Sequence, residues 1–179
     1  MSIRRSPIRS SVAAAFAGAM LLAAAPALAA DEDNTKQPGS AIQLPTPPAG
    51  KGQVVFFRKG GLSGSAVACS VFEKGVKVSS LGGGRYFVLA TEPGRHEFTV
   101  KTEAKDVLAL EVESGDTQFA QCRIKMGVMV GRPDIAPATE ADFRGMKSLR
   151  LVDADDMGAG AMHADEMKAN TAPAAAPAN

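Results

Sequence analysis

The feature that most constrains the fold is a two-residue alternation of apolar and polar side chains in three segments between residues 95 and 126. In the first alternating segment, His96, Phe98 and Val100 are separated by charged or hydroxyl side chains. Leu108–Val112 and Ala120–Met126 repeat this pattern. Successive side chains of a β-strand point to opposite faces of a sheet, so the pattern predicts three strands with one buried and one exposed face.

Further strands are predicted on both sides of this region. Residues 54–57 form a continuous apolar run, which is typical of a strand covered on both faces. Turn signals at Glu73-Lys74-Gly75, Gly82–Gly84 and Pro93-Gly94 separate other short strands, and residues 149–152 form a last one. Together these elements predict an all-β fold, an antiparallel β-sandwich of seven to eight short strands.

One short helix is expected near the C-terminal end of the sandwich. Thr139 is a suitable N-cap for a helix through Glu140, Asp142 and Phe143, and Gly145 would end it.

Residues 1–30 have the layout of a cleavable signal peptide. Three arginines form a basic start, an apolar run rich in alanine follows, and Ala27-Leu28-Ala29 supplies the small–x–small cleavage pattern. The alternative is a retained membrane anchor, but a run of small alanines inserts weakly. We expect export to the periplasm or the medium, by the Sec or twin-arginine route, with no stable membrane span after cleavage.

The segments next to the predicted domain are poor in core-forming residues. Residues 31–50 are acidic and then Pro-rich, which predicts a flexible linker. Residues 153–179 contain mainly Ala, Pro, Gly, Met and Asp, which predicts a disordered tail. Residues 51–152 remain as a single β-sandwich domain of about 100 residues, enough for one modest core.

The charge of the exported chain excludes some partners. The full chain has 20 Lys and Arg against 19 Asp and Glu, and three of the basic residues lie in the leader, so the mature net charge is about −2. A nucleic-acid-binding protein needs a basic face or a platform of aromatic side chains, and this chain has no Trp and one Tyr. We expect no nucleic-acid partner.

Cys69 and Cys122, the two cysteines, both fall on predicted inward faces. In an oxidising compartment such a pair commonly forms a disulfide, and closing a loop of this length stabilises a domain by about 4 kcal/mol. The alternative is two free thiols that pack as small apolar side chains. Their spacing is not Cys-x-x-Cys, so we expect no redox role.

The order of strands and turns resembles the bacterial "domain of unknown function 2846" family of exported proteins and lipoproteins over residues 50–152. The likeness is carried by Val54-Val55-Phe56-Phe57-Arg58, Gly75, Val78, Leu81, Gly84, Tyr86 and Pro93-Gly94-Arg95-His96. The resemblance implies an envelope-facing β-sandwich and no assigned activity. This chain departs from many members because it has no cysteine near the cleavage site to carry a lipid.

Two residues of this pattern, His96 and Arg58, are the candidate functional residues of the domain. An imidazole can titrate near neutrality or bind a metal. The strand pattern points His96 inward, however, where a lone histidine is usually hydrogen-bonded and structural. A metal site needs further ligands, and the other histidine, His163, lies in the predicted tail.

The remaining motifs are incomplete. The segment from Asp153 begins like a calcium loop but has Ala164 where a bidentate glutamate is required. Met157, Met162, His163 and Met167 form a tail with soft-metal ligands, but nothing in the spacing organises them. We expect no catalytic residues, no cofactor and no enzyme activity.

The sequence therefore favours an exported, non-catalytic envelope module that binds a protein or a cell-wall component. Sheet edges and exposed loops such as Lys59–Ala66 are the expected contact surfaces. The alternative is a carrier of a small ligand or a soft metal, which uses His96 or the Met/His tail.

Overall fold

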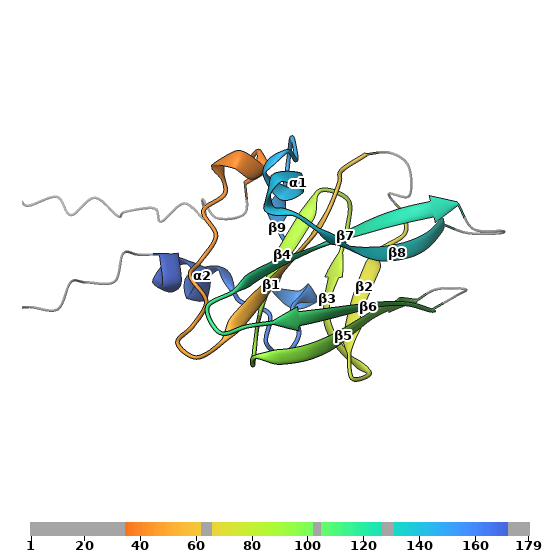
Figure 1. The fold of residues 1–179 in the computed structure, drawn as a ribbon. Helices are drawn as coiled ribbons and strands as arrows, with labels where there is room; N and C mark the ends of the chain where they lie inside the picture. The colour runs from red at the N-terminus through yellow and green to blue at the C-terminus, as the bar shows by residue number, and fades with distance from the viewer. Residues whose placement is uncertain (1–34, 62–65, 102–104, 127–130, 172–179) are drawn as a thin grey trace, which may run out of the picture. The chain divides into compact units, whose positions relative to one another are not determined.

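The computed structural model describes residues 35–61, 66–101, 105–126 and 131–171. The predicted signal peptide lies outside these residues. Within them, nine strands form two sheets that pack face to face (Figure 1). The predicted β-sandwich is confirmed.

The five-stranded sheet has the order β8-β7-β1-β4-β9, and the four-stranded sheet has the order β3-β2-β5-β6. The strands of the first are β1 (Gly52–Arg58), β4 (Arg85–Thr91), β7 (Thr117–Met126), β8 (Gly131–Ala138) and β9 (Arg150–Leu151). The strands of the second are β2 (Cys69–Glu73), β3 (Val76–Leu81), β5 (Gly94–Lys101) and β6 (Lys105–Val112). The five-stranded sheet is mixed rather than antiparallel throughout, because β1 pairs in parallel with β7 and β4 in parallel with β9.

Four short helical elements are described, one before β1, one between β8 and β9, and two after β9. They are the 3-10 helices η2 (Gly39–Ala41) and η3 (Ala154–Asp156) and the α-helices α1 (Glu140–Arg144) and α2 (Ala164–Thr171). The prediction for α1 is confirmed in detail. The Thr139 hydroxyl accepts a hydrogen bond from the Asp142 backbone N–H at 3.1 Å, the Asp142 carboxylate accepts one from the Thr139 N–H, and Gly145 is the C-cap.

The main core lies between the two sheets and is built on phenylalanines. Phe56 of β1 stacks on Phe87 of β4 with ring centroids 4.8 Å apart, and Phe98 of β5 meets Phe56 edge-on at 4.9 Å. The inward residues of β2 and β6, predicted from the alternating pattern, complete this core. All three phenylalanine side chains are fully buried.

A second core covers the other face of the five-stranded sheet. All seven residues of β1 are buried, so the interpretation of its apolar run as a strand covered on both faces is confirmed. Val55 and Phe57 point into this second core, where Phe143 of α1 packs edge-on against Phe57 and Tyr86. The segments that cover this face come from outside the predicted 51–152 boundary as well as from α1.

The C-terminal segment differs from its prediction, because residues 153–171 are ordered. Met162 and Met167 are buried in the second core, and residues 160–162 pair with β4 through the bonds Ala90 N–H to Gly160 O and Met162 N–H to Val88 O. Composition suggested disorder because these residues include few β-branched or aromatic side chains. Two methionines placed on an apolar sheet are nevertheless enough to anchor the segment. Residues 172–179 lie outside the described residues.

The predicted linker also differs from its prediction over residues 35–50, which follow a fixed course across the same face. Ile42 is buried in the second core, and Gln37 forms an antiparallel bridge with Leu149. The Gln53 amide donates to the Pro45 carbonyl at 2.8 Å. Residues 31–34 lie outside the described part of the chain.

Several sheet edges are closed, although sheet edges were expected to be contact surfaces. On β8, the residues directed away from β7 include Pro133 and Pro137, which have no N–H, while the Ile135 N–H donates to the Asp106 carboxylate of β6 at 2.8 Å. The prolines also explain why β8 was not predicted.

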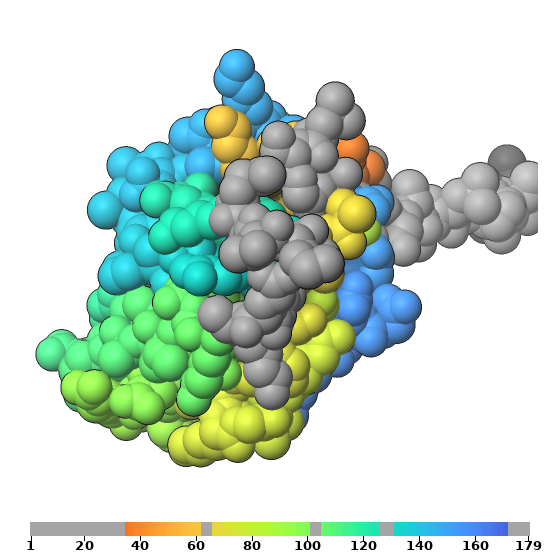
Figure 2. Space-filling view, turned by 90° about the vertical axis from the view of Figure 1, so that its right-hand side faces the viewer, coloured from red at the N-terminus to blue at the C-terminus, as the bar shows by residue number. Residues whose placement is uncertain are grey.

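Figure 2 shows β8, in cyan, lying over β6, in green, on this side. On the other side, the Gly158 N–H donates to the Val78 carbonyl of β3.

The ordered tail predicts unequal effects of two C-terminal deletions. A chain that ends before Asp153 loses the burial of Met162 and Met167 and uncovers the edge of β4. We expect a loss of about 3–6 kcal/mol in the free energy of unfolding, measured by urea denaturation. The control chain ends at Thr171 and should unfold at the same urea concentration as the full chain. Equal midpoints for all three chains would contradict an anchored tail.

Candidate functional site

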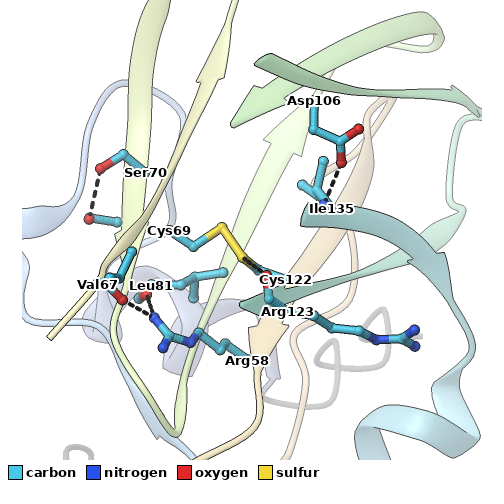
Figure 3. The surroundings of a disulfide bond; sticks show 10 residues. Arg58, Val67, Cys69, Ser70, Leu81, Asp106, Cys122, Arg123 and Ile135 are labelled. Carbon is cyan, nitrogen blue, oxygen red and sulfur yellow. Dashed lines mark hydrogen bonds between the residues drawn. A yellow bond between two sulfur atoms is a disulfide. The ribbon is translucent and has the colours of Figure 1, made fainter. Parts of the chain in front are cut away.

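A disulfide joins the two sheets of the sandwich. Cys69 of β2 and Cys122 of β7 are bonded with an S–S distance of 2.05 Å, and both side chains are buried in the main core (Figure 3). The predicted disulfide is therefore present in the structure, and the alternative of two free thiols is not. It links residues 53 positions apart, at the end of the sandwich where β1 ends and β2 begins.

Arg58 lies directly beside this disulfide, opposite Cys122 in the pairing of β1 with β7. Its Nη1 donates to the Val67 carbonyl at 2.5 Å and to the Leu81 carbonyl at 3.1 Å. The side chain is almost completely buried, and this burial lowers the pKa of the guanidinium below its ordinary value. In Figure 3 the guanidinium is directed towards these two carbonyls. Arg58 thus holds the segment before β2 against the end of β3.

His96 is buried, as its strand pattern predicted, and both ring nitrogens have hydrogen-bond partners. Nε2 lies 2.8 Å from the Glu92 carbonyl, so it must donate. Nδ1 lies 2.6 Å from Oε1 of Glu73, within hydrogen-bond distance of this carboxyl group. The Thr91 hydroxyl is 3.2 Å from the ring. These contacts tie β5 to the end of β2 and to the β4–β5 turn, and both ring nitrogens have partners within the protein.

Glu73 is the member of this cluster that the sequence pattern did not identify. It was interpreted only as a turn residue of the β2–β3 hairpin. It reaches His96 because β2 pairs with β5, which places Glu73 opposite Phe98. No short-range signal in the sequence specifies that register, since two other strands, β3 and β4, lie between β2 and β5 in the chain.

The residues of the proposed soft-metal tail are not brought together by the structure. The side chains of Met162 and Met167 are buried in the second core and Met157 packs against it, whereas His163 is exposed. The His163 N–H donates to the Glu166 carboxylate at 2.8 Å and caps α2. Among the described residues, no group of three or more His, Cys, Asp or Glu is placed to hold a metal ion.

A concavity lies between η2 and α2, and we call it the terminal groove. Its volume is about 400 Å³. The floor is apolar and the rim is polar; the lining residues are Gln37, Ala41, Ile42, Gln43, Tyr86, Leu151, Ala164, Met167, Lys168 and Thr171. An apolar floor with a few polar groups at the rim is the usual form of a binding pocket, and this volume lies within the range of such sites.

Sequence reasoning missed the terminal groove because eight of its ten lining residues lie outside the predicted domain of residues 51–152, in segments that were predicted to be a linker and a disordered tail. Only the burial of Ile42 and Met167 on the sheet brings the two segments together. No helix in the described part of the chain is both long and apolar enough to cross a membrane.

Comparison with known families matches residues 48–133 to the family described as "Protein of unknown function (DUF2846)". This segment contains β1 to β7 and the beginning of β8, and therefore most of both sheets and the disulfide. No curated protein and no solved structure matches the chain.

The disulfide predicts a large and measurable contribution to stability. Replacing both cysteines, Cys69→Ala with Cys122→Ala, should lower the free energy of unfolding by about 4 kcal/mol, because the unfolded chain regains the entropy of an open 53-residue loop. Urea denaturation of the two proteins measures the difference. Alkylation of the native protein without reductant should label no thiol, and two labelled cysteines would refute the bond.

The His96–Glu73 contact predicts strong coupling between the two residues. In a double-mutant cycle with His96→Gln and Glu73→Gln, we expect a coupling energy of about 1–3 kcal/mol, because both groups are largely buried and directly bonded. The control is Glu97→Gln on the exposed face of β5. The ion pair of Glu97 with Arg95 is exposed to solvent, so this substitution should change the free energy of unfolding by less than about 0.5 kcal/mol. Additive effects of the two buried substitutions would contradict the contact.

Proposed function

We propose that this chain, whose residues 48–133 belong to the DUF2846 family of proteins of unknown function, is an exported, non-catalytic module that binds another envelope protein or a cell-wall component. The terminal groove is the proposed contact surface. The observation that carries the proposal is the apolar floor of this groove. The floor is formed by Ile42, Tyr86, Leu151 and Met167, and polar residues surround it on a sheet face that is otherwise covered by other segments.

Two further observations support this function. The layout of residues 1–30 favours export, and a buried disulfide is typical of proteins that fold in an oxidising compartment such as the periplasm. The two buried candidate residues, His96 and Arg58, are hydrogen-bonded within the sandwich and hold neighbouring segments in place. Binding rather than reaction chemistry is the use that this arrangement favours.

The volume of the terminal groove favours a second candidate, a carrier of a small ligand. About 400 Å³ is enough for a small molecule to lie over Met167 of the C-terminal segment. In this version of the carrier hypothesis, His96 takes no direct part, because its two nitrogens are already bonded.

Crosslinking in living cells tests the proposal. A photoreactive amino acid is placed at Gln43 or Lys168 on the rim of the groove, and at Glu111 on the exposed side of β6 as the control. We expect one dominant adduct from the rim positions and none from Glu111, because a bound partner covers the groove. Adducts from Glu111 alone would contradict the assigned surface. If the rim gives no protein adduct, native mass spectrometry of the purified chain tests the carrier candidate through a bound small molecule.

A further inference from the structure

A second place for a partner lies at the end of β1, where Arg58 lies beside Cys122 of the disulfide. β1 pairs with β7 only as far as Arg58, which lies opposite Cys122. β7 continues to Met126 and remains paired on its other side with β8. Residues 123–126 of β7 therefore have one open edge, the edge that faces β1 earlier in the strand. No strand among the described residues pairs with it. We call this place the β7 notch.

The backbone of β7 is directed into the β7 notch at alternate residues. Pro133 has no N–H, and the Ile135 N–H bonds to Asp106 rather than to β7. The backbone N–H and C=O groups of the odd-numbered residues of β8 are therefore directed away from β7. In an antiparallel pair, opposite residues direct their backbone groups either towards each other or both away. Ile124 lies opposite Pro133, so its N–H and C=O point away from β8 and into the notch.

The β7 notch is also a cavity with basic walls. Its volume is about 430 Å³, and its lining includes Arg58, Lys59, Arg123 and the glycines Gly60 and Gly61, with no acidic residue in it. Lys59 and Arg123 are exposed. Two exposed cations, Lys59 and Arg123, thus lie at one strand end beside the buried Arg58, and Arg123 also acts on the Asp142 carboxylate. Exposed cations of this kind attract carboxylates.

Arg123 is held in place for such an interaction. Its Nε and Nη2 donate to Oε1 of Gln121 at 2.9 and 2.7 Å, which fixes the plane of the guanidinium. Arg58 contributes charge rather than a contact, because its Nη1 is bonded to the two carbonyls described above. Figure 3 shows the side chains of Arg58 and Arg123 directed away from each other. Lys59 and Arg123 are exposed, so a ligand can reach them.

We propose that the β7 notch binds an extended acidic peptide segment of a partner protein, which adds as a short strand along Ile124–Met126 while its carboxylates contact Lys59 and Arg123. Main-chain hydrogen bonds supply affinity in this mode of recognition, and the charged side chains supply selectivity. Every residue of the site lies within residues 48–133, whereas nine of the ten residues lining the terminal groove do not. The two sites are therefore independent proposals.

Fluorescence anisotropy with a labelled octapeptide of alternating Val and Glu tests the site, using the chain from Asp31 onward. We expect saturable binding that weakens about tenfold in Lys59→Gln or Arg123→Gln. Binding should weaken further as salt is raised, because the charges are exposed. The matched control is Lys74→Gln, an exposed cation at the far end of β2, which should bind the peptide as the unchanged protein does. A Val/Lys peptide of the same length should not bind.

Two readouts separate strand addition from simple attraction of anions. Amide NMR signals of Ile124 and Met126 should shift on titration, and N-methylation of the peptide along one edge, but not the other, should abolish binding. Equal binding of the two N-methylated peptides, or equal binding of polyphosphate without these amide shifts, would overturn strand addition. Unchanged affinity in both Lys59→Gln and Arg123→Gln, with circular dichroism that shows both variants folded, would overturn the site. A failure here leaves the groove crosslinks unaffected, and the reverse also holds.

Discussion

The structure depends on one strand that is apolar on both faces. β1 has Val54 and Phe56 on the side of the main core and Val55 and Phe57 on the other, so water must be excluded from both sides of the five-stranded sheet. The four-stranded sheet covers one side. The other side is covered by the segments before β1 and after β8, which explains why residues that look like a linker and a tail are part of the folded body.

Much of the sandwich could be predicted because its signal is local. The alternation in β5, β6 and β7 and the turn residues between strands are visible within short windows of sequence, and the buried cysteines follow from the same alternation. β8 escaped prediction because Pro133 and Pro137 break the pattern that identifies strands. The same prolines protect it as an edge strand, so the feature that hides β8 in the sequence is what its position requires.

The candidate sites were harder to predict because they depend on register between distant strands. That His96 would point inward followed from its neighbours, but its bond to Glu73 depends on the pairing of β2 with β5. The contacts of Arg58 were unpredictable for the same reason, because its partners, the carbonyls of Val67 and Leu81, come from two other segments. The terminal groove requires two segments on either side of the domain to meet on one sheet face. Composition alone describes each of those segments as unstructured.

The parallel pairing of β1 with β7 has a consequence for how the chain acquires its structure. Gln53 lies opposite Thr117, so the first strand to leave the ribosome or a translocation channel waits for a partner more than sixty residues later. Contacts of such long range slow folding, and until β7 arrives one edge of the apolar strand β1 stays unpaired, even after β4 has paired with the other edge. An apolar strand with an open edge is prone to pair with other chains. The order in which the strands emerge therefore makes this exposure during folding a property of the topology rather than of any single residue.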